Sequence, residues 1–425
     1  MVPEPRPGTA EEAARLWALG RRDEAIVLFG ALQAQHPDNP GLALRLGMAL
    51  LVAGRLGEAL PLLEHAAALA PGDATALAWL DRALGAVHGQ GAMAEAVPAL
   101  QARLAEEPDN LNRRVRLAST LLANGRFEEG WPHYAWRWKG MAEEWRQPAD
   151  PLVRPDPAAW RGRRVLLFAE QGFGDSLQFL RYVRPVQAIA TEVMVEVQPA
   201  LKRLAASLPG RPAVLSQGET VPAHDVAVPL LHLPWAFGTV PATIPAEVPY
   251  LAADADAVAG WRARLAGLPG LKVGLAWAGD PRPQDRAAHR VDRRRSVALA
   301  ALAPLGGVRG VSFVSVQTGE AARQAAPAGM MLHDWTAELG DFADTAALMQ
   351  ALDLVITVDT ACVHLAGALG RPVWMLNRFD SCWRWLRDRD DSPWYPTLRL
   401  FRQAAPGDWG GVVQRVAAAL AERVG

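Results

Sequence analysis

Apolar residues in the first third of the chain recur every three or four positions. The pattern is clearest in two consecutive segments, whose apolar positions are Ala43, Leu46, Gly47 and Leu50, then Ala59, Leu62, Leu63 and Ala66. Residues spaced in this way share one face of an α-helix. The pattern therefore predicts pairs of amphipathic helices that pack against their neighbours.

Glycine and proline interrupt this helical pattern at a nearly constant interval. Related hexapeptides begin at Gly20, Gly54, Gly91 and Gly125, and related tetrapeptides contain Pro37, Pro71 and Pro108. The glycines are 34, 37 and 34 residues apart, and the prolines are 34 and 37 residues apart. Gly suits the turn inside a helix pair, and Pro-Asp suits the start of the next pair. We therefore predict a solenoid that resembles a tetratricopeptide array of roughly three and a half units.

Stacked helix pairs of this kind form a concave surface that commonly holds another polypeptide. The alternative is that the array only packs against the domain that follows it. We assign residues 1–140 to the solenoid and residues 141–162 to a linker rich in Trp and Pro.

The tryptophans near the end of the solenoid form a group of their own: Trp131, Trp136, Trp138, Trp145 and Trp160. The prolines between residues 148 and 157 exclude a continuous helix there. Because the segment lies between domains, we expect these rings to bury the end of the solenoid against the next domain rather than to bind a ligand.

Short apolar runs alternate with helical patterns over the remainder of the chain. The runs that we predict as strands cover residues 164–170, 192–197, 224–231, 271–279, 311–317, 353–358 and 372–376. The segment 177–189 has the pattern of a helix. Strands that alternate with helices predict parallel sheets covered on both faces. We expect two such domains, residues 163–255 and 256–425, with ligands at the carboxyl ends of the strands.

Composition narrows the range of functions. The formal net charge of −1 argues against a general nucleic-acid binder, and two cysteines, Cys362 and Cys382, are too few for a disulfide scaffold. The N-terminus lacks the pattern of a signal peptide, and no apolar run is long enough to cross a bilayer. We expect a cytoplasmic protein with no membrane span.

A strand that ends at Val358 and leads into a helix carries the clearest chemical signal. Asp359 and Thr360 are good helix-capping residues, and the backbone N–H groups of a helix start attract phosphate. Small residues follow, which would let a bulky ligand approach. His364 lies one turn further along, where it is either a phosphate ligand or a hydrogen-bonded helix residue.

Several motifs in order resemble one family over nearly the whole chain. They are EQGFGDSLQFLRY, KVGLAWAGDP with RRRS, VSVQTG, DFADTAALMQALDLVITVDTACVHLAGALGRPVW and WYPTLRLFRQ. Together they resemble bacterial glycosyltransferases of the heptosyltransferase type that carry an N-terminal tetratricopeptide array. The resemblance implies a GT-B fold of two Rossmann-like domains, a nucleotide-sugar donor on the C-terminal domain, and no requirement for a metal or another cofactor.

The resemblance also implies a catalytic base in the first Gly-Asp turn, where this chain has Asp175. Gly172 and Gly174 permit a close backbone approach, and Gln171 precedes them. An acid at a helix start can act as a general base or only cap the helix. Glu170, at the end of the strand, is the competing carboxylate, and the sequence leaves the choice between the two acids open.

The donor-binding residues that we predict lie at strand ends and helix starts of the C-terminal domain. They are Trp277, Gly279, Arg295, Ser296, Gln317, Asp359, Thr360, His364, Leu365 and Ala366. An arginine fork suits a diphosphate. We interpret Asp388, Asp390 and Asp391 as exposed loop acids rather than as metal ligands.

We therefore expect a metal-independent, inverting glycosyltransferase that transfers a sugar from a nucleotide-sugar donor to a hydroxyl acceptor. Because the solenoid suits a polypeptide, we expect the acceptor to be a protein or to arrive with one, and the resemblance makes a surface protein such as flagellin an example. The alternative is a non-catalytic scaffold whose sugar-binding fold is degenerate. The sequence does not identify the sugar, the nucleotide, the acceptor or the oligomeric state.

Overall fold

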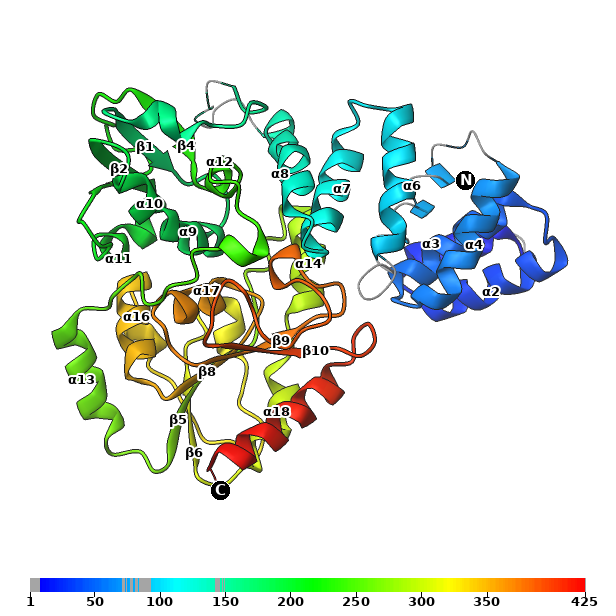
Figure 1. The fold of residues 1–425 in the computed structure, drawn as a ribbon. Helices are drawn as coiled ribbons and strands as arrows, with labels where there is room; N and C mark the ends of the chain where they lie inside the picture. Colours follow the sequence, from blue (N-terminus) through cyan, green and yellow to red (C-terminus); the bar gives the residue numbers. More distant parts are fainter. Residues whose placement is uncertain are drawn as a thin grey trace. The chain divides into compact units, whose positions relative to one another are not determined.

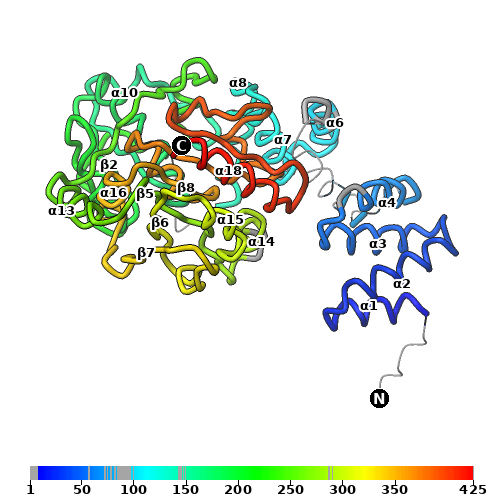
Figure 2. The backbone as a smooth tube through the Cα atoms, turned by 90° about the horizontal axis from the view of Figure 1, so that it is seen from below, coloured from blue at the N-terminus to red at the C-terminus, as the bar shows by residue number. Residues whose placement is uncertain are grey.

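The chain forms two compact units, Met1–Ala96 and Val97–Gly425. The computed structural model (Figure 1) describes residues 8–70, 73, 75–76, 79–80, 83, 93–141, 146, 148 and 150–424. The first unit contains the helices α1 (Ala10–Ala18), α2 (Arg22–Gln35), α3 (Pro40–Val52) and α4 (Leu56–Leu69). Figure 2 shows these helices running back and forth as successive hairpins.

The described turns inside the helix pairs share the same local structure, a glycine followed by an arginine that pairs with a glutamate. Gly20, Gly54 and Gly125 have φ angles of 80°, 82° and 73°, a region that glycine adopts without strain. The next residue is always an arginine, and its guanidinium forms two hydrogen bonds with the glutamate three positions later. These pairs are Arg21–Glu24, Arg55–Glu58 and Arg126–Glu129. The Gly-Arg-x-x-Glu motif thus sets the start of the second helix in each pair.

The connections between helix pairs end in asparagine caps. Asn39 accepts a hydrogen bond from the backbone N–H of Leu42, and Asn110 accepts one from that of Arg113, both at 3.1 Å. These caps satisfy backbone donors that a helix start leaves free. The predicted tetratricopeptide architecture is confirmed in the described residues, whereas the markers at Pro71 and Gly91 lie outside them.

The last repeat helices belong to the second unit. They are α6 (Met93–Glu106, which begins at the end of the first unit), α7 (Leu111–Ala123), α8 (Phe127–Ala135) and the 3₁₀ helix η1 (Trp136–Gly140). The buried indole of Trp131 donates a hydrogen bond to the carbonyl of Thr239 at 2.8 Å. Its ring also meets the edge of Trp383, with ring centroids 5.4 Å apart. The end of the repeats is therefore built into the α/β body, and Trp145 lies outside the described residues.

Replacing Trp131 by alanine should destabilise the second unit by about 3–5 kcal/mol, because the change leaves a large cavity and an unpaired carbonyl. Urea unfolding of the full chain measures this loss. Trp136→Ala is the matched control, since that half-buried ring lies between the cations of Arg114 and Lys139 and should cost about 1 kcal/mol. Equal losses in the two variants would contradict the packing described here.

The first α/β half contains a four-stranded parallel sheet in the order β3-β2-β1-β4. Its elements are β1 (Arg164–Phe168), α9 (Phe173–Phe179), η3 (Leu180–Tyr182), α10 (Val183–Gln187), β2 (Glu192–Val197), α11 (Lys202–Ala205), β3 (Ala213–Ser216), β4 (Val226–Pro229) and α12 (Leu233–Ala236). The order reverses between β1 and β4, so the loops after these two strands flank the position where such sheets bind ligands.

The second α/β half contains a six-stranded parallel sheet in the order β10-β9-β8-β5-β6-β7. Its main elements are α13 (Ala255–Leu265), β5 (Leu271–Ala276), α14 (Arg286–Arg295), α15 (Ala303–Gly306), β6 (Val311–Ser315), β7 (Leu332–His333), α16 (Phe342–Ala351), β8 (Leu354–Val358), α17 (Ala361–Ala368), β9 (Val373–Asn377), η10 (Trp383–Trp385), β10 (Leu398–Arg402) and α18 (Trp409–Val424). Here the order reverses between β5 and β8. The two doubly wound sheets confirm the predicted fold class.

The segment predicted as one helix, 177–189, is instead three short pieces: the end of α9, then η3, then α10. Pro185 lies in the last piece and has no N–H to continue a helical ladder. The helix also begins earlier than predicted, at Phe173, so the Gly-Asp turn forms its first turn.

The described part of the chain contains no helix that is long and apolar enough to cross a membrane.

Candidate active site

The carboxyl ends of the two sheets face each other within the second unit. Helix α9 follows β1 and helix α17 follows β8, and the two helices pack together (Figure 1). The helices approach closely at Gly174, where a Cβ atom would lie 2.8 Å from Cδ2 of His364 and 3.6 Å from the Cα of Ala361. A larger residue at position 174 would push the helices apart, so glycine is required for this contact.

Asp175 occupies the third position of α9, and Gly172 is the N-cap residue. One carboxylate oxygen, Oδ2, accepts a hydrogen bond from the Gly172 N–H at 3.0 Å. The other, Oδ1, forms an ion pair with Nη2 of Arg384. The Asp175 side chain is 22% exposed. The carboxylate therefore does cap the helix, from inside its first turn, and remains reachable by a ligand.

Arg384 is a site residue that the sequence did not reveal. Its guanidinium is buried and donates from Nε to Gln178 Oε1 at 2.7 Å and from Nη1 to Cys382 Sγ at 3.2 Å. It also stacks on the ring of Trp383, 4.3 Å from the centroid. The available signal was an arginine between two tryptophans, but its partner Asp175 is 209 positions away in the sequence.

The turn that carries Arg384 is held by aromatic contacts from the end of the repeats. Trp383 meets the edges of Trp131 and Tyr134 from helix α8 at centroid distances of 5.4 and 5.7 Å. Immediately after η10, Leu386 and Asp388 have φ angles of 47° and 50°. Residues other than glycine rarely adopt such angles unless their surroundings impose them. The repeat end thus helps to hold the Arg384 turn in place.

Glu170, the competing carboxylate, is buried beneath this site. Its Oε1 accepts hydrogen bonds from Nη2 of Arg137 at 2.8 Å and from the Leu231 N–H at 3.2 Å. Burial raises the pKa of Glu170 to about 7, although Arg137 acts in the opposite direction. The same Arg137 nitrogen lies 3.0 Å from Nδ1 of His232. Glu170 therefore ties η1 to the first sheet, and its side chain has no exposed surface.

Trp277 and Gln317 support the loop that follows β5. The ring of Trp277 is buried in the core of the second half. The Gln317 side-chain oxygen accepts hydrogen bonds from the backbone N–H groups of Trp277 and Ala278 at 2.9 and 2.8 Å, and its amide nitrogen donates to the Thr318 carbonyl. Both side chains are buried, and Gln317 fixes the backbone of the loop.

Gly279, Ser296 and Arg295 form a second cluster around Asp292. Ser296 Oγ accepts a hydrogen bond from the Gly279 N–H at 2.9 Å and donates one to Asp292. Arg295 pairs with Asp292 through Nε at 3.0 Å and reaches the Asp359 carbonyl through Nη1 at 3.2 Å. The cluster links the loop after β5 to the loop after β8. It brings together four of the residues predicted to bind the donor.

His364 is buried in the contact between the two halves. Its Nδ1 lies 3.0 Å from the Tyr395 hydroxyl, and its ring stacks on Trp385 at 5.2 Å. Burial, together with the guanidinium groups of Arg384 and Arg181, holds the pKa of His364 well below its usual value, so the imidazole is neutral. It can act at the site as a hydrogen-bonding group but not as a cation.

The other predicted residues around α17 divide into two kinds. Thr360 is the N-cap residue, is only partly buried, and forms no side-chain cap hydrogen bond. Leu365 and Ala366 are completely buried and serve the packing of the helix. In the first half, the carbonyl of Gln171 accepts a hydrogen bond from the Gln198 amide at 2.7 Å, which fixes the backbone before α9.

The loop acids behave as surface groups. Asp391 forms hydrogen bonds with the Arg389 guanidinium at 2.6 and 2.7 Å. Asp390 contributes its backbone carbonyl to Leu400.

Family models match two parts of the chain. Residues 16–82 match the tetratricopeptide repeat, and residues 315–377 match glycosyltransferase family 9 (heptosyltransferase). The second match contains β8 and α17, with Asp359, Thr360 and His364.

Two solved structures are similar to the α/β part. The E. coli ADP-heptose lipopolysaccharide heptosyltransferase II is 13% identical, with a TM-score of 0.43, over 61% of this chain and 98% of that one. A glycosyl transferase family 9 protein from Veillonella parvula is 10% identical, with a TM-score of 0.43, over 62% of this chain and 97% of that one.

A curated relative is protein FlbA of Caulobacter vibrioides. It is 30% identical over an alignment of 452 residues, which covers 98% of this chain and 73% of FlbA. The chain therefore belongs to the family of protein FlbA, and it joins tetratricopeptide repeats to a glycosyltransferase family 9 domain of the heptosyltransferase type.

Proposed function

We propose that this protein transfers a sugar from a nucleotide-sugar donor to a hydroxyl group of an acceptor, with inversion at the anomeric carbon and without a metal ion. One observation carries the proposal. The partly exposed carboxylate of Asp175 lies at the start of α9, and α9 packs against α17, whose N-terminus begins at Thr360. An acid and an anion-binding helix start are thus next to each other.

The donor diphosphate binds at the start of α17. Backbone N–H groups and the helix dipole favour an anion there. The partly exposed Thr360 adds a hydroxyl group, and Arg295, which is held by Asp292 and by the Asp359 carbonyl, adds a positive charge. The sheet order supports this location, because β5 and β8 flank the point where ligands of such sheets bind.

The reaction follows from these positions. Asp175 accepts the proton of the acceptor hydroxyl as its oxygen attacks the anomeric carbon. The bond between that carbon and the diphosphate oxygen breaks, and its electron pair leaves with the diphosphate. The start of α17 and Arg295 stabilise the resulting negative charge. Attack from the face opposite the leaving group inverts the anomeric configuration.

The acceptor is a protein or is carried by one. The first unit consists of helix pairs with the tetratricopeptide architecture, and such arrays commonly hold polypeptides. A bacterial surface protein such as flagellin is a suitable acceptor.

Donor binding tests this proposal without knowledge of the acceptor. UDP, GDP, ADP and CMP, each alone and as its sugar conjugate, are added to the full chain, and the melting temperature is recorded as a function of ligand concentration. We expect one nucleotide to stabilise the chain. Thr360→Val should weaken that binding about 10-fold or more, since a hydrogen bond to a charged group is lost.

Thr336→Val is the matched control, because that threonine begins the 3₁₀ helix Thr336–Glu338 before α16 and forms hydrogen bonds with Asp334. It should bind the nucleotide as the wild-type chain does. A chain that none of the nucleotides stabilises would support the non-catalytic scaffold instead.

A further inference from the structure

We propose that Arg384 is a positioning residue for the catalytic base: it reaches from the second α/β half to the first and holds the carboxylate of Asp175 in the correct orientation. This inference rests on the proposed function. Each α/β half then contributes one residue to the general base: the carboxylate comes from α9, and the guanidinium that orients it comes from η10.

The geometry leaves the Asp175 carboxylate little freedom to rotate. Its Oδ2 accepts from the Gly172 N–H at 3.0 Å, and its Oδ1 is paired with Arg384. A carboxylate has about four lone-pair directions, so this arrangement leaves acceptor capacity on a side chain that is 22% exposed. The ion pair thus fixes the group without covering it.

Arg384 is itself held rigidly, as a positioning residue must be. Its side chain is only 8% exposed. Gln178 accepts from Nε, and Gln178 lies on α9, one helical turn after Asp175. The guanidinium therefore contacts α9 at two neighbouring residues, Asp175 and Gln178, and the Trp383 ring packs on the guanidinium plane. An arginine fork has the planar, two-pronged shape that this contact requires, and lysine does not.

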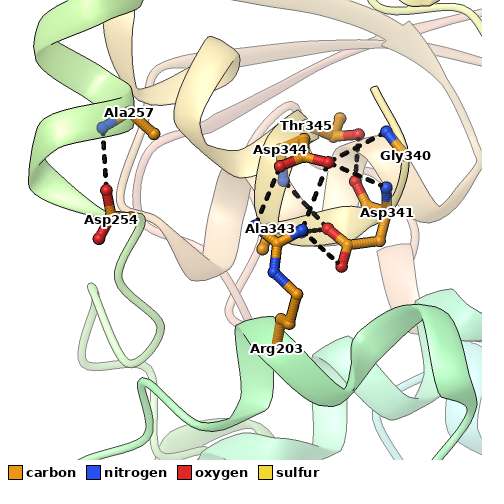
Figure 3. Close-up of polar contacts among 8 residues, drawn as sticks. All are labelled: Arg203, Asp254, Ala257, Gly340, Asp341, Ala343, Asp344 and Thr345. Carbon is orange, nitrogen blue, oxygen red and sulfur yellow. Dashed lines mark hydrogen bonds and ion pairs between the residues drawn. The ribbon is translucent and has the colours of Figure 1, made fainter. Parts of the chain in front are cut away.

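A second arginine that joins the halves shows what a merely structural contact looks like. Arg203 at α11 reaches the start of α16, where Nη1 lies 3.0 Å from Asp341 Oδ2 and Nη2 lies 3.0 Å from Asp344 Oδ1 (Figure 3). Its side chain is 62% exposed. Because it contacts neither Asp175 nor α17 in these interactions, it provides a matched control for loss of a contact between the halves.

The test measures release of nucleotide from UDP-, GDP-, ADP- and CMP-linked sugars by the full chain. Arg384→Gln should lower kcat about 10- to 100-fold with little change in the donor KM, because a misplaced catalytic group costs rate rather than donor affinity. In an Asp175→Asn background, the same change should have no further effect. Arg384→Lys should recover only part of the loss, and Arg203→Gln should keep the wild-type kcat.

A wild-type kcat in Arg384→Gln would overturn the inference. It would also be overturned if Arg384→Gln lowered kcat by the same factor in the wild-type chain and in the Asp175→Asn variant. If Arg384→Gln does not fold, Arg384→Lys decides by the same criterion: a kcat below wild type at an unchanged donor KM supports the inference, and a wild-type kcat overturns it. A folded wild-type chain that releases no nucleotide from any donor refutes the proposed function, and the inference falls with it. Normal release by the wild type and by both Arg384 variants refutes the inference alone.

Discussion

Asn in place of Asp175 should reduce turnover by about 10²- to 10⁴-fold, the usual cost of losing a general base. The amide keeps the size of the carboxylate and can still accept the Gly172 N–H, so the start of α9 should persist. It cannot receive the proton of the acceptor hydroxyl. Nucleotide release under saturating donor gives kcat, and the nucleotide-dependent rise in melting temperature reports donor binding, which should stay intact.

Asp225→Asn is the matched control for this variant. Asp225 is also a carboxylate of the first half that is paired with an arginine, Arg164, at 3.1 Å, but it lies just before β4, at the amino end of the sheet. We expect wild-type turnover from it. Near-normal turnover in Asp175→Asn would show that Asp175 is not the general base. Glu170 would be a poor alternative because its side chain is buried.

Deleting residues 1–92, which removes the first unit up to the start of α6, should abolish sugar transfer to the protein acceptor while slow hydrolysis of the nucleotide-sugar continues. The helix pairs of this unit supply the surface that we expect to hold the acceptor, whereas Asp175, Arg384 and the start of α17 all belong to the second unit. Incorporation of labelled sugar into flagellin measures the transfer, and nucleotide release without flagellin measures the hydrolysis.

The position of the cut decides whether this experiment can be interpreted. Leu117, Leu121 and Leu122 of α7 are almost completely buried, and Trp131 of α8 bonds Thr239. A deletion that extended into these helices would expose the core of the second unit and mimic loss of acceptor binding. A chain that lacks residues 1–92 and still modifies its acceptor at full rate would show that the first unit is not the element that holds it.

The repeats and the sheets could be predicted because their signals are local. A glycine every 34 to 37 residues and an apolar residue every three or four positions need no knowledge of distant contacts. The strands β3, β7 and β10 were missed. The first two contain only four and two residues, too few to establish an alternating pattern.

The site was predictable only where a motif marks a strand end. Asp175 and Thr360 fall at the starts of α9 and α17, as expected from the sequence. Sequence alone does not show which way a side chain points at a strand end. In the structure the Trp277 ring is buried in the core and Gln317 holds the loop after β5, and contact of these two residues with the donor stays a prediction. Arg384 could not be predicted, because its pairing with Asp175 depends on the packing of two domains.

The most direct test of the central claim is a ¹H NMR time course of the full chain with its stabilising nucleotide-sugar, in the presence of EDTA and with water as the acceptor. We expect the wild-type chain to consume the donor and the first sugar released to have the anomeric configuration opposite to that of the donor. Asp175→Asn should consume the donor at least about 100-fold more slowly. Retention of configuration, a requirement for added metal, or equal consumption by the two chains would contradict the claim.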